Sequence, residues 1–367
     1  MTHHEIVACF PHMANYAYAF KYICEHGFEV KYLIPPPITR RTLELGSRTS
    51  PDYVCSPFKY CMGCYLEALE LGANCLMQIY GGCRLNYYGE LNARILRDMG
   101  YDPKDVGRNG YEFEFFDMAA VNWRSPKDIY EHFKIINPDL SMVKIAKAVP
   151  VTFKIIKVLD EFEDFIRHNI GFEVHDGDFD ATYHEFLSKL ENIADGKELK
   201  ALSQEYRKKL HAIPLNKPAK TIKVGMVGDY YTVQEPFSNY FMEKELAKFG
   251  MEVYRQMNFT NSIIHNQGRK KEKIAKRYAK YALGATANST IGEAITFAKE
   301  GCAGIIQVKS FGCMPEIDAM PILQNVSRDY GVPILHFSFD SQTSETGVRT
   351  RLEAFYDMVE ARNGRKA

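Results

Sequence analysis

The chain has 367 residues, 46% of them hydrophobic, and its 46 basic and 46 acidic side chains give a formal net charge of zero. This length allows two domains with sizeable cores, and the hydrophobic fraction is ordinary for a globular protein. The lack of a basic excess argues against a general nucleic-acid binder. No apolar run approaches the roughly 20 residues of a membrane span. We therefore expect a globular protein that binds neither nucleic acid nor a membrane.

The start of the chain has no signal-peptide pattern, because Met1–Glu5 leads directly into a short apolar stretch. This predicts a cytoplasmic protein. Its nine cysteines are too sparse for a disulfide scaffold, and a reducing compartment disfavours one. Five of the nine fall between Cys55 and Cys83. Such a concentration is typical of metal or cluster binding.

The first segment of the chain, residues 1–120, alternates strand and helix signals. Glycines end the predicted helices, and Pro35–Pro37 stops the second predicted strand. Strands are predicted at 5–10, 28–34, 75–80 and 111–116, and helices at 14–25, 64–71 and 88–99. This alternation predicts βαβ units and a mostly parallel sheet.

Strand signals stop between residues 121 and 217, where apolar spacing predicts four helices at 126–136, 142–169, 181–195 and 198–212. A proline-containing segment, Pro214–Pro218, is typical of a linker. The alternation then resumes, with strands predicted at 222–227, 252–256, 304–308 and 333–339 and helices at 238–249, 271–282, 291–299, 315–330 and 347–361. We therefore predict an α/β protein with two flavodoxin- or Rossmann-like parallel-sheet domains, 1–120 and 218–367, and a helical insert or bridge at 121–217.

Two segments, Gly72–Cys83 and Gly301–Cys313, share one pattern. In each, a glycine ends a helix, an apolar strand with a central glutamine follows (Gln78, Gln307), and a Gly-Cys pair stands where the next helix should begin. The match favours a distant duplication of the α/β unit. Ligands bind beyond the carboxyl ends of strands in parallel sheets, so the pattern places Cys83 and Cys313 at a candidate binding edge.

A helix start favours negative charge and lowers the pKa of a thiol, and the thiolate is the form that binds metal or an iron–sulfur cluster. Adjacent glycines let a bulky inorganic group approach the backbone. The alternative is that these cysteines are small buried hydrophobes. The CxxC motif Cys61–Cys64 is compatible with half a zinc site, a redox pair or chance. Four further cysteines are interpreted mostly as packing residues: Cys9, Cys24, Cys75 and Cys302.

The remaining chemical signals are weaker. His12 and His336 stand near predicted strand ends, where each is either a proton donor or a satisfied buried histidine. The basic run from Arg269 to Lys280 is either a solvated helix face or a docking surface for an acidic partner or for phosphates. Gly225–Asp229 follows a strand but is not a dinucleotide fingerprint, and the chain has no Walker A motif.

Several separated motifs carry a resemblance: Pro35–Thr39, Thr42–Gly46, Cys55–Lys59, Gly81–Arg84, Tyr88–Glu90, Glu235–Asn239, Ala287–Glu293, Cys313–Glu316 and Thr350–Phe355. Together they resemble the 2-hydroxyacyl-CoA dehydratase component family, in particular its stand-alone branch described as CoA-protein activase or dehydratase D-component-like. The resemblance covers nearly the whole chain and is weakest across the helical middle.

The resemblance implies a 4Fe–4S cluster in a cleft between two α/β domains, held by Cys55, Cys83 and Cys313 with one iron open. It implies that a separate ATP-hydrolysing iron–sulfur activator supplies a low-potential electron for reduction or dehydration of a small substrate such as a CoA thioester. It also implies an oxygen-sensitive homo- or heterodimer. Cys61 and Cys64 depart from the usual pattern, and with Cys75 they are candidate extra ligands for the double-cubane cluster of related reductases. Two rival hypotheses stay open: a non-catalytic electron-transfer partner of a larger activator, and a cluster-free α/β ligand-binding protein.

Overall fold

The computed structural model describes residues 6–78, 83, 85–101, 114–117, 127, 130, 131, 134 and 137–364. The chain forms two compact units. The N-terminal unit comprises Met1–Val54, Phe58–Ile156 and Ile193–Gly196, and the C-terminal unit comprises Cys55–Pro57, Lys157–Asn192 and Lys197–Ala367. The short segment Cys55–Pro57 thus belongs to the C-terminal unit although the residues on both sides of it do not.

The N-terminal unit contains a four-stranded parallel sheet in the order β2-β1-β3-β4. In the register of its centre, Ala8 pairs with Cys75, which in turn pairs with Glu114. The strands are β1 (Val7–Cys9), β2 (Lys31–Tyr32), β3 (Cys75–Gln78) and β4 (Glu114–Asp117). This confirms the parallel sheet predicted from the alternating pattern. The first three residues of the predicted strand 111–116 lie outside the described part of the chain.

The helices of this segment are α1 (Ala17–Ile23), the π-helical turn η1 (Cys24–Phe28), α2 (Arg40–Thr49), α3 (Ser56–Glu70) and α4 (Leu85–Asp98). Helix α2 was not predicted. Its signal is a capping box: the hydroxyl of Thr39 accepts from the Thr42 N–H, and the hydroxyl of Thr42 accepts from the Thr39 N–H. Helix α3 begins at Ser56 rather than at Cys64, so the CxxC motif lies inside a helix.

Three helices follow: α6 (Met142–Asn169), α7 (Asp178–Leu190) and α8 (Gly196–His211). The bounds of α6 are those predicted, and Pro150 is accommodated inside it. Most of the predicted helix 126–136 lies outside the described residues. In the described part of the chain, no helix combines the length and the apolar character that a membrane span requires.

The C-terminal unit contains a second four-stranded parallel sheet, in the order β6-β5-β7-β8. Its strands are β5 (Ile222–Gly228), β6 (Met251–Tyr254), β7 (Gly304–Ser310) and β8 (Ile334–Phe339). In both units the first strand lies between the second and the third, which supports the predicted duplication. The chain leaves β5 for one neighbour and later returns on the other side. This reversal makes the carboxyl ends of β5 and β7 the switch point at which such sheets bind ligands.

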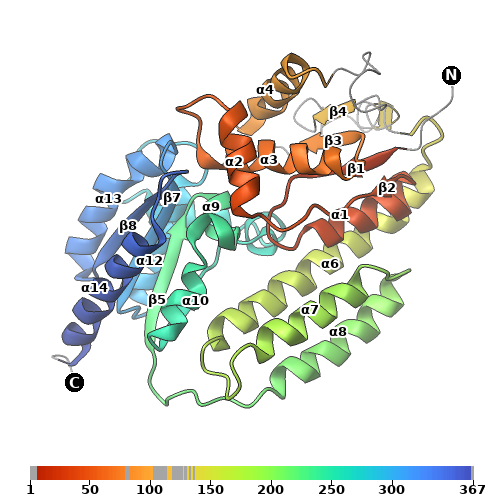
Figure 1. Cartoon of the computed structure of the whole chain (residues 1–367). Coiled ribbons are helices and arrows are strands. Elements are labelled where there is room, and N and C mark those ends of the chain that lie inside the picture. The colour runs from red at the N-terminus through yellow and green to blue at the C-terminus, as the bar shows by residue number, and fades with distance from the viewer. Residues whose placement is uncertain are drawn as a thin grey trace. The chain divides into compact units, whose positions relative to one another are not determined.

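Helices cover both faces of this sheet (Figure 1). Val224 and Met226 of β5 pack toward α10 (Met242–Lys248) and α14 (Glu345–Gly364), whereas Val227 packs toward α12 (Ala287–Lys299) and α13 (Met314–Tyr330). Burial on both faces explains why these strands are almost continuously apolar. The remaining elements are α9 (Tyr230–Gln234), η3 (Pro236–Asn239), η4 (Thr260–Ile264) and α11 (Gln267–Ala275).

The predicted helix 238–249 is confirmed only from Met242 to Lys248, as α10, because a break separates it from η3. Tyr240 and Phe241 both adopt the left-handed conformation, with φ of 59° and 52°. Two consecutive left-handed residues reverse the chain and cannot continue a right-handed helix. The apolar spacing alone did not reveal this break.

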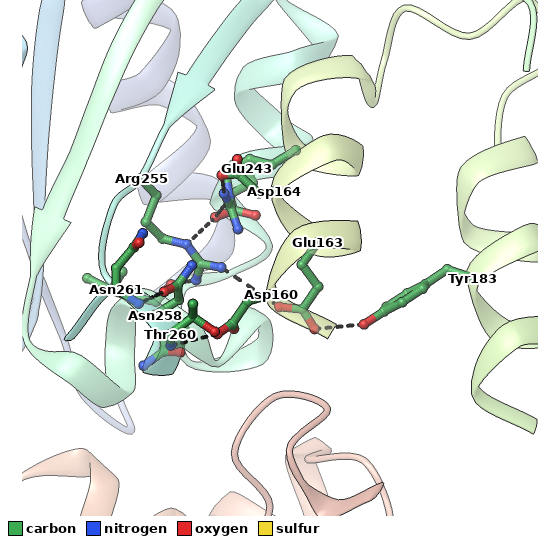
Figure 2. Close-up of polar contacts among 12 residues, drawn as sticks. Asp160, Glu163, Asp164, Tyr183, Glu243, Arg255, Asn258, Thr260 and Asn261 are labelled. Carbon is green, nitrogen blue, oxygen red and sulfur yellow. Dashed lines mark hydrogen bonds and ion pairs between the residues drawn. The ribbon is translucent and has the colours of Figure 1, made fainter. Parts of the chain in front are cut away.

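A charged cluster within the C-terminal unit joins α6 to the edge of the sheet (Figure 2). Glu243 of α10 accepts from the Nε of Arg167 at 2.9 Å and lies 3.3 Å from the Nε of Arg255, which follows β6. Asp164 accepts from the Nη1 of Arg167 at 2.7 Å. Both guanidinium groups are buried, so their shared carboxylate compensates two charges at once.

The cluster continues along α6. Glu163 accepts a 3.0 Å hydrogen bond from the hydroxyl of Tyr183 on α7, and Asp160 accepts one of 2.7 Å from the N–H of Thr260 in η4 (Figure 2). One face of α6 therefore contacts both the next helix and the loop after β6. These bonds fix the position of the helical segment against the sheet of its own unit.

Candidate functional site

The end of β5 approaches the end of β7 through a glycine. Gly228 has a φ of +149°, and a Cβ there would lie 1.7 Å from the carbonyl oxygen of Val308, so only glycine fits. The next residue, Asp229, accepts from the N–H of Thr232 at 2.8 Å and from the N–H of Ser310 at 2.7 Å. A buried carboxylate thus connects the two strands at the switch point.

Cys313 lies at this edge. It is the N-cap of α13, and Pro315 occupies the first turn of that helix. The Cys313 N–H donates to the carbonyl of Ser310 at 3.1 Å, and its own carbonyl accepts from the N–H of Ile317. The structure therefore confirms the predicted position of this cysteine, after a strand and at a helix start.

Cys55 lies beside Cys313 in the same unit. A Cβ added at Gly312 would lie 3.4 Å from the Cα of Cys55 and 3.5 Å from its nitrogen. The next residue, Ser56, donates from its N–H to the hydroxyl of Ser310 at 2.8 Å and from its hydroxyl to the carbonyl of Phe339 at 2.9 Å. Two of the three predicted ligands are therefore neighbours at one sheet edge.

The helix start does lower the pKa of Cys313, through the backbone N–H of Glu316 in the first turn of α13, but it does not set the net direction. Burial raises the pKa of this thiol well above its ordinary value, and the carboxylates of Asp229 and Glu316 raise it further. Desolvation and two nearby acids outweigh the partial charge of the helix end. These effects favour the neutral form of the Cys313 thiol, and a bound metal would displace its proton.

Glu316 lies in the first turn of α13, fully buried. Its carboxylate accepts from the hydroxyls of Thr290 at 2.8 Å and Thr286 at 3.1 Å and from the Nε2 of Gln307 at 2.8 Å. Burial nevertheless raises the pKa of Glu316 to about 7. The first turn of α13 thus holds a carboxyl group that can carry a proton near neutral pH.

His336 completes this network from β8. Its Nδ1 lies 2.6 Å from the Oε1 of Gln307, so Nδ1 carries the hydrogen and donates it. Burial lowers the pKa of His336 to about 4. Of the two roles considered for this residue, the structure supports the satisfied histidine.

Lys309 is a buried cation next to these groups, with 2% of its surface exposed. Because side chains alternate along a strand, Lys309 lies on the same face of β7 as Gln307, toward α13. Burial lowers the pKa of Lys309, whereas Cys313, Asp229 and Glu316 raise it. The edge therefore combines one cation with two acids and a thiol.

Cys83 lies in the N-terminal unit, shortly before α4, and is exposed. It follows β3 as Cys313 follows β7, and the glutamines of both strands are buried. The Tyr65 hydroxyl lies 2.8 Å from the Oε1 of Gln78. The glycines that precede Cys83 lie outside the described residues. As a third ligand, Cys83 stays a prediction.

The other cysteines are buried, and none of the nine, all at described positions, forms a disulfide. Cys61 and Cys64 lie in α3, on either side of Gly63. A Cβ on Gly63 would lie 1.9 Å from the carbonyl oxygen of Thr42 in α2, so this glycine lets the two helices cross closely. Helix packing thus accounts for the glycine of the CxxC motif. Within the described residues, no group of three or more His, Cys, Asp or Glu side chains is arranged to hold a metal ion.

The family model for the 2-hydroxyglutaryl-CoA dehydratase D-component matches residues 142–359, which is more than half of the chain. The chain belongs to this family. No curated protein matches it. The D-component match includes Cys313 but neither Cys55 nor Cys83. It confirms the family that the sequence motifs indicated, and it leaves the ligand set to be tested separately.

The residues of this D-component relative fit part of an iron–sulfur site. Cysteine thiolates are the usual ligands of such clusters, and the C-terminal unit brings two cysteines together with a glycine between strand and helix. The sequence motifs did not reveal the residues that surround them. Asp229 directly follows β5, and Ser310 is the last residue of β7. A polar residue at the carboxyl end of an apolar strand is the signal that could have identified both.

Proposed function

We propose that this protein is an iron–sulfur component of the 2-hydroxyacyl-CoA dehydratase type, with Cys55, Cys83 and Cys313 as ligands of a 4Fe–4S cluster. The observation that carries the proposal is the proximity of Cys55 and Cys313 at the carboxyl edge of β7, the edge at which parallel sheets bind ligands. Cys83 would supply the third thiolate from the matching position of the N-terminal unit. The D-component match supports the family-level part of this proposal.

A cluster held in this way would supply a low-potential electron, received from an ATP-hydrolysing iron–sulfur activator, to a small substrate such as a CoA thioester. The chain itself contributes charge and protons. Lys309 places a positive charge on the cysteine side of the sheet, and Glu316 holds a proton near neutral pH. The cytoplasmic location, the dimeric state and the activator remain predictions from the sequence.

The test is iron and sulfide analysis of the full-length protein purified without oxygen, combined with EPR after reduction. The variants Cys55→Ser, Cys83→Ser and Cys313→Ser should each lose most of the bound iron. Cys302→Ala is the matched control, because Cys302 is buried in the core of the same unit as Cys313. The ligand assignment would be overturned if the wild type bound as little iron as the three cysteine-to-serine variants. It would also be overturned if Cys302→Ala lost as much iron as those variants.

A further inference from the structure

Ser56 connects the start of α3 to two strands of the C-terminal unit, β7 and β8. It is the first residue of α3, where a helical N–H has no acceptor within its own helix. The hydroxyl of Ser310 at the end of β7 supplies that acceptor, and the hydroxyl of Ser56 donates to the carbonyl of Phe339 at the end of β8. Both serines are buried, so these bonds are shielded from water.

Ser310 is itself held from the other side. Its N–H donates to Asp229 at 2.7 Å, and the same carboxylate accepts from the Thr232 N–H. The bonds form a continuous chain from β5 through β7 to the residue after Cys55. This chain explains why Cys55–Pro57 belongs to the C-terminal unit while the residues on both sides belong to the other.

These hydrogen bonds place Cys55 close to Cys313. Cys55 directly precedes Ser56, and its backbone lies against Gly312, the residue before Cys313. The segment that carries Cys55 is therefore hydrogen-bonded to Ser310, three residues before Cys313. All of these contacts are made by residues that belong to the C-terminal unit.

We propose that Ser56 and Ser310 are positioning residues that hold the thiols of Cys55 and Cys313 side by side before any metal binds. The C-terminal unit would then carry a preformed two-thiol half of the site. The proposal rests on the proposed function for its purpose, but the arrangement itself consists of hydrogen bonds and packing within the chain. Preorganisation of this kind reduces the ordering cost that the ligands pay when a metal arrives.

The experiment uses the full-length, reduced and chelator-treated protein carrying Cys83→Ser, so that Cys55 and Cys313 are the two cysteines that are not buried. Dibromobimane, which links two nearby thiols, reports their proximity, and monobromobimane labels each thiol separately and reports access. Peptide mass spectrometry identifies the linked residues. We expect a Cys55–Cys313 link in the parent protein.

Ser56→Ala and Ser310→Ala should each slow the linking reaction by about threefold to tenfold, the factor that one hydrogen bond supplies. Labelling by monobromobimane and the melting temperature should change much less. Ser56→Thr keeps the hydroxyl and should retain the parent rate. Ser338→Ala is the matched control, because Ser338 is an exposed serine on the neighbouring strand β8.

Failure to link Cys55 to Cys313 in a parent protein whose two thiols both react with monobromobimane would overturn the proposal, as would unchanged linking rates in both alanine variants. Iron uptake by the wild type is measured in parallel. Efficient linking without iron uptake would leave the positioning role intact and contradict the proposed function. Iron uptake that depends on the cysteines but not on the two serines would support the proposed function and contradict the positioning role.

Discussion

The N–H of Ser56 donates to the hydroxyl of Ser310 at 2.8 Å, although the two residues are 254 positions apart in the chain. This bond places the start of α3 at the carboxyl end of β7, where Cys313 begins α13. The candidate site of the C-terminal unit is thus assembled from segments that are distant in the sequence. Its structure depends on a few residues whose substitution should have a measurable effect.

Gly228 should be irreplaceable. A Cβ at this position would meet the Val308 carbonyl, and the backbone conformation is one that L side chains rarely adopt. We expect Gly228→Ala to lower the free energy of unfolding by more than about 3 kcal/mol, measured by urea denaturation. Gly301→Ala is the control: Gly301 also has a positive φ, of +83°, but nothing lies within 4 Å of its added Cβ, so its loss should be about 1 kcal/mol. Equal losses would contradict the argument from close approach.

Glu243 should be essential for the cluster of Figure 2. Removing its carboxylate in Glu243→Ala leaves the buried guanidinium groups of Arg167 and Arg255 without their shared partner. We expect a loss of about 3–5 kcal/mol in the free energy of unfolding. Glu245→Ala on the same helix removes an exposed pair with Lys248 and should cost less than about 1 kcal/mol. The measurement is the melting temperature of Glu243→Ala and of Glu245→Ala. Similar melting temperatures in the two variants would contradict a buried charge cluster.

Glu293 should make stability depend on pH. Burial raises the pKa of this carboxyl to about 8, from an ordinary value of 4.5. Between these values the unfolded chain releases a proton that the folded protein retains, so the free energy of unfolding should fall as pH rises from about 5 to about 8. Glu293→Gln should remove the part of this decrease in unfolding free energy that comes from Glu293. At pH 8 the variant should therefore be more stable than the wild type by a few kcal/mol.

The control for this prediction is Glu300→Gln, because Glu300 is exposed at the end of the same helix. Denaturation curves at pH 5 and pH 8 give the comparison. Glu316 remains in the Glu293 variant and keeps some of the slope, since its own pKa is raised to about 7. A variant whose stability falls as steeply as that of the wild type would show that Glu293 is ionised in the folded protein.

Lys309 should raise the reduction potential of the proposed iron–sulfur cluster. A buried positive charge on the cysteine side of the sheet stabilises the more negative, reduced state of a nearby redox group. Lys309→Met should therefore make the reduction potential more negative, measured by an EPR-monitored redox titration. Lys299→Met, at an exposed helix end, should leave the potential unchanged. A shift to a more positive potential in Lys309→Met would contradict the electrostatic role.

Local patterns predicted most elements because periodicity and chain breakers act over a few residues. The bounds of α6 and the strands at 222–227 and 304–308 follow from apolar spacing and from glycines or prolines near their ends. The same reasoning failed at 238–249, where two left-handed residues break the helix without a glycine or proline. It also missed α2, whose mostly polar surface gives little apolar periodicity.

The sequence by itself determined the two α/β units, the family and the location of Cys313 between a strand and a helix, because each depends on residues close together in the chain. Only the tertiary structure decided that Cys55 lies beside Cys313, that Asp229 and the two serines connect these cysteines to the sheet, and that burial raises the pKa of the Cys313 thiol. Contacts across 254 positions and the desolvation of a buried group depend on how distant segments pack. No local pattern encodes that packing.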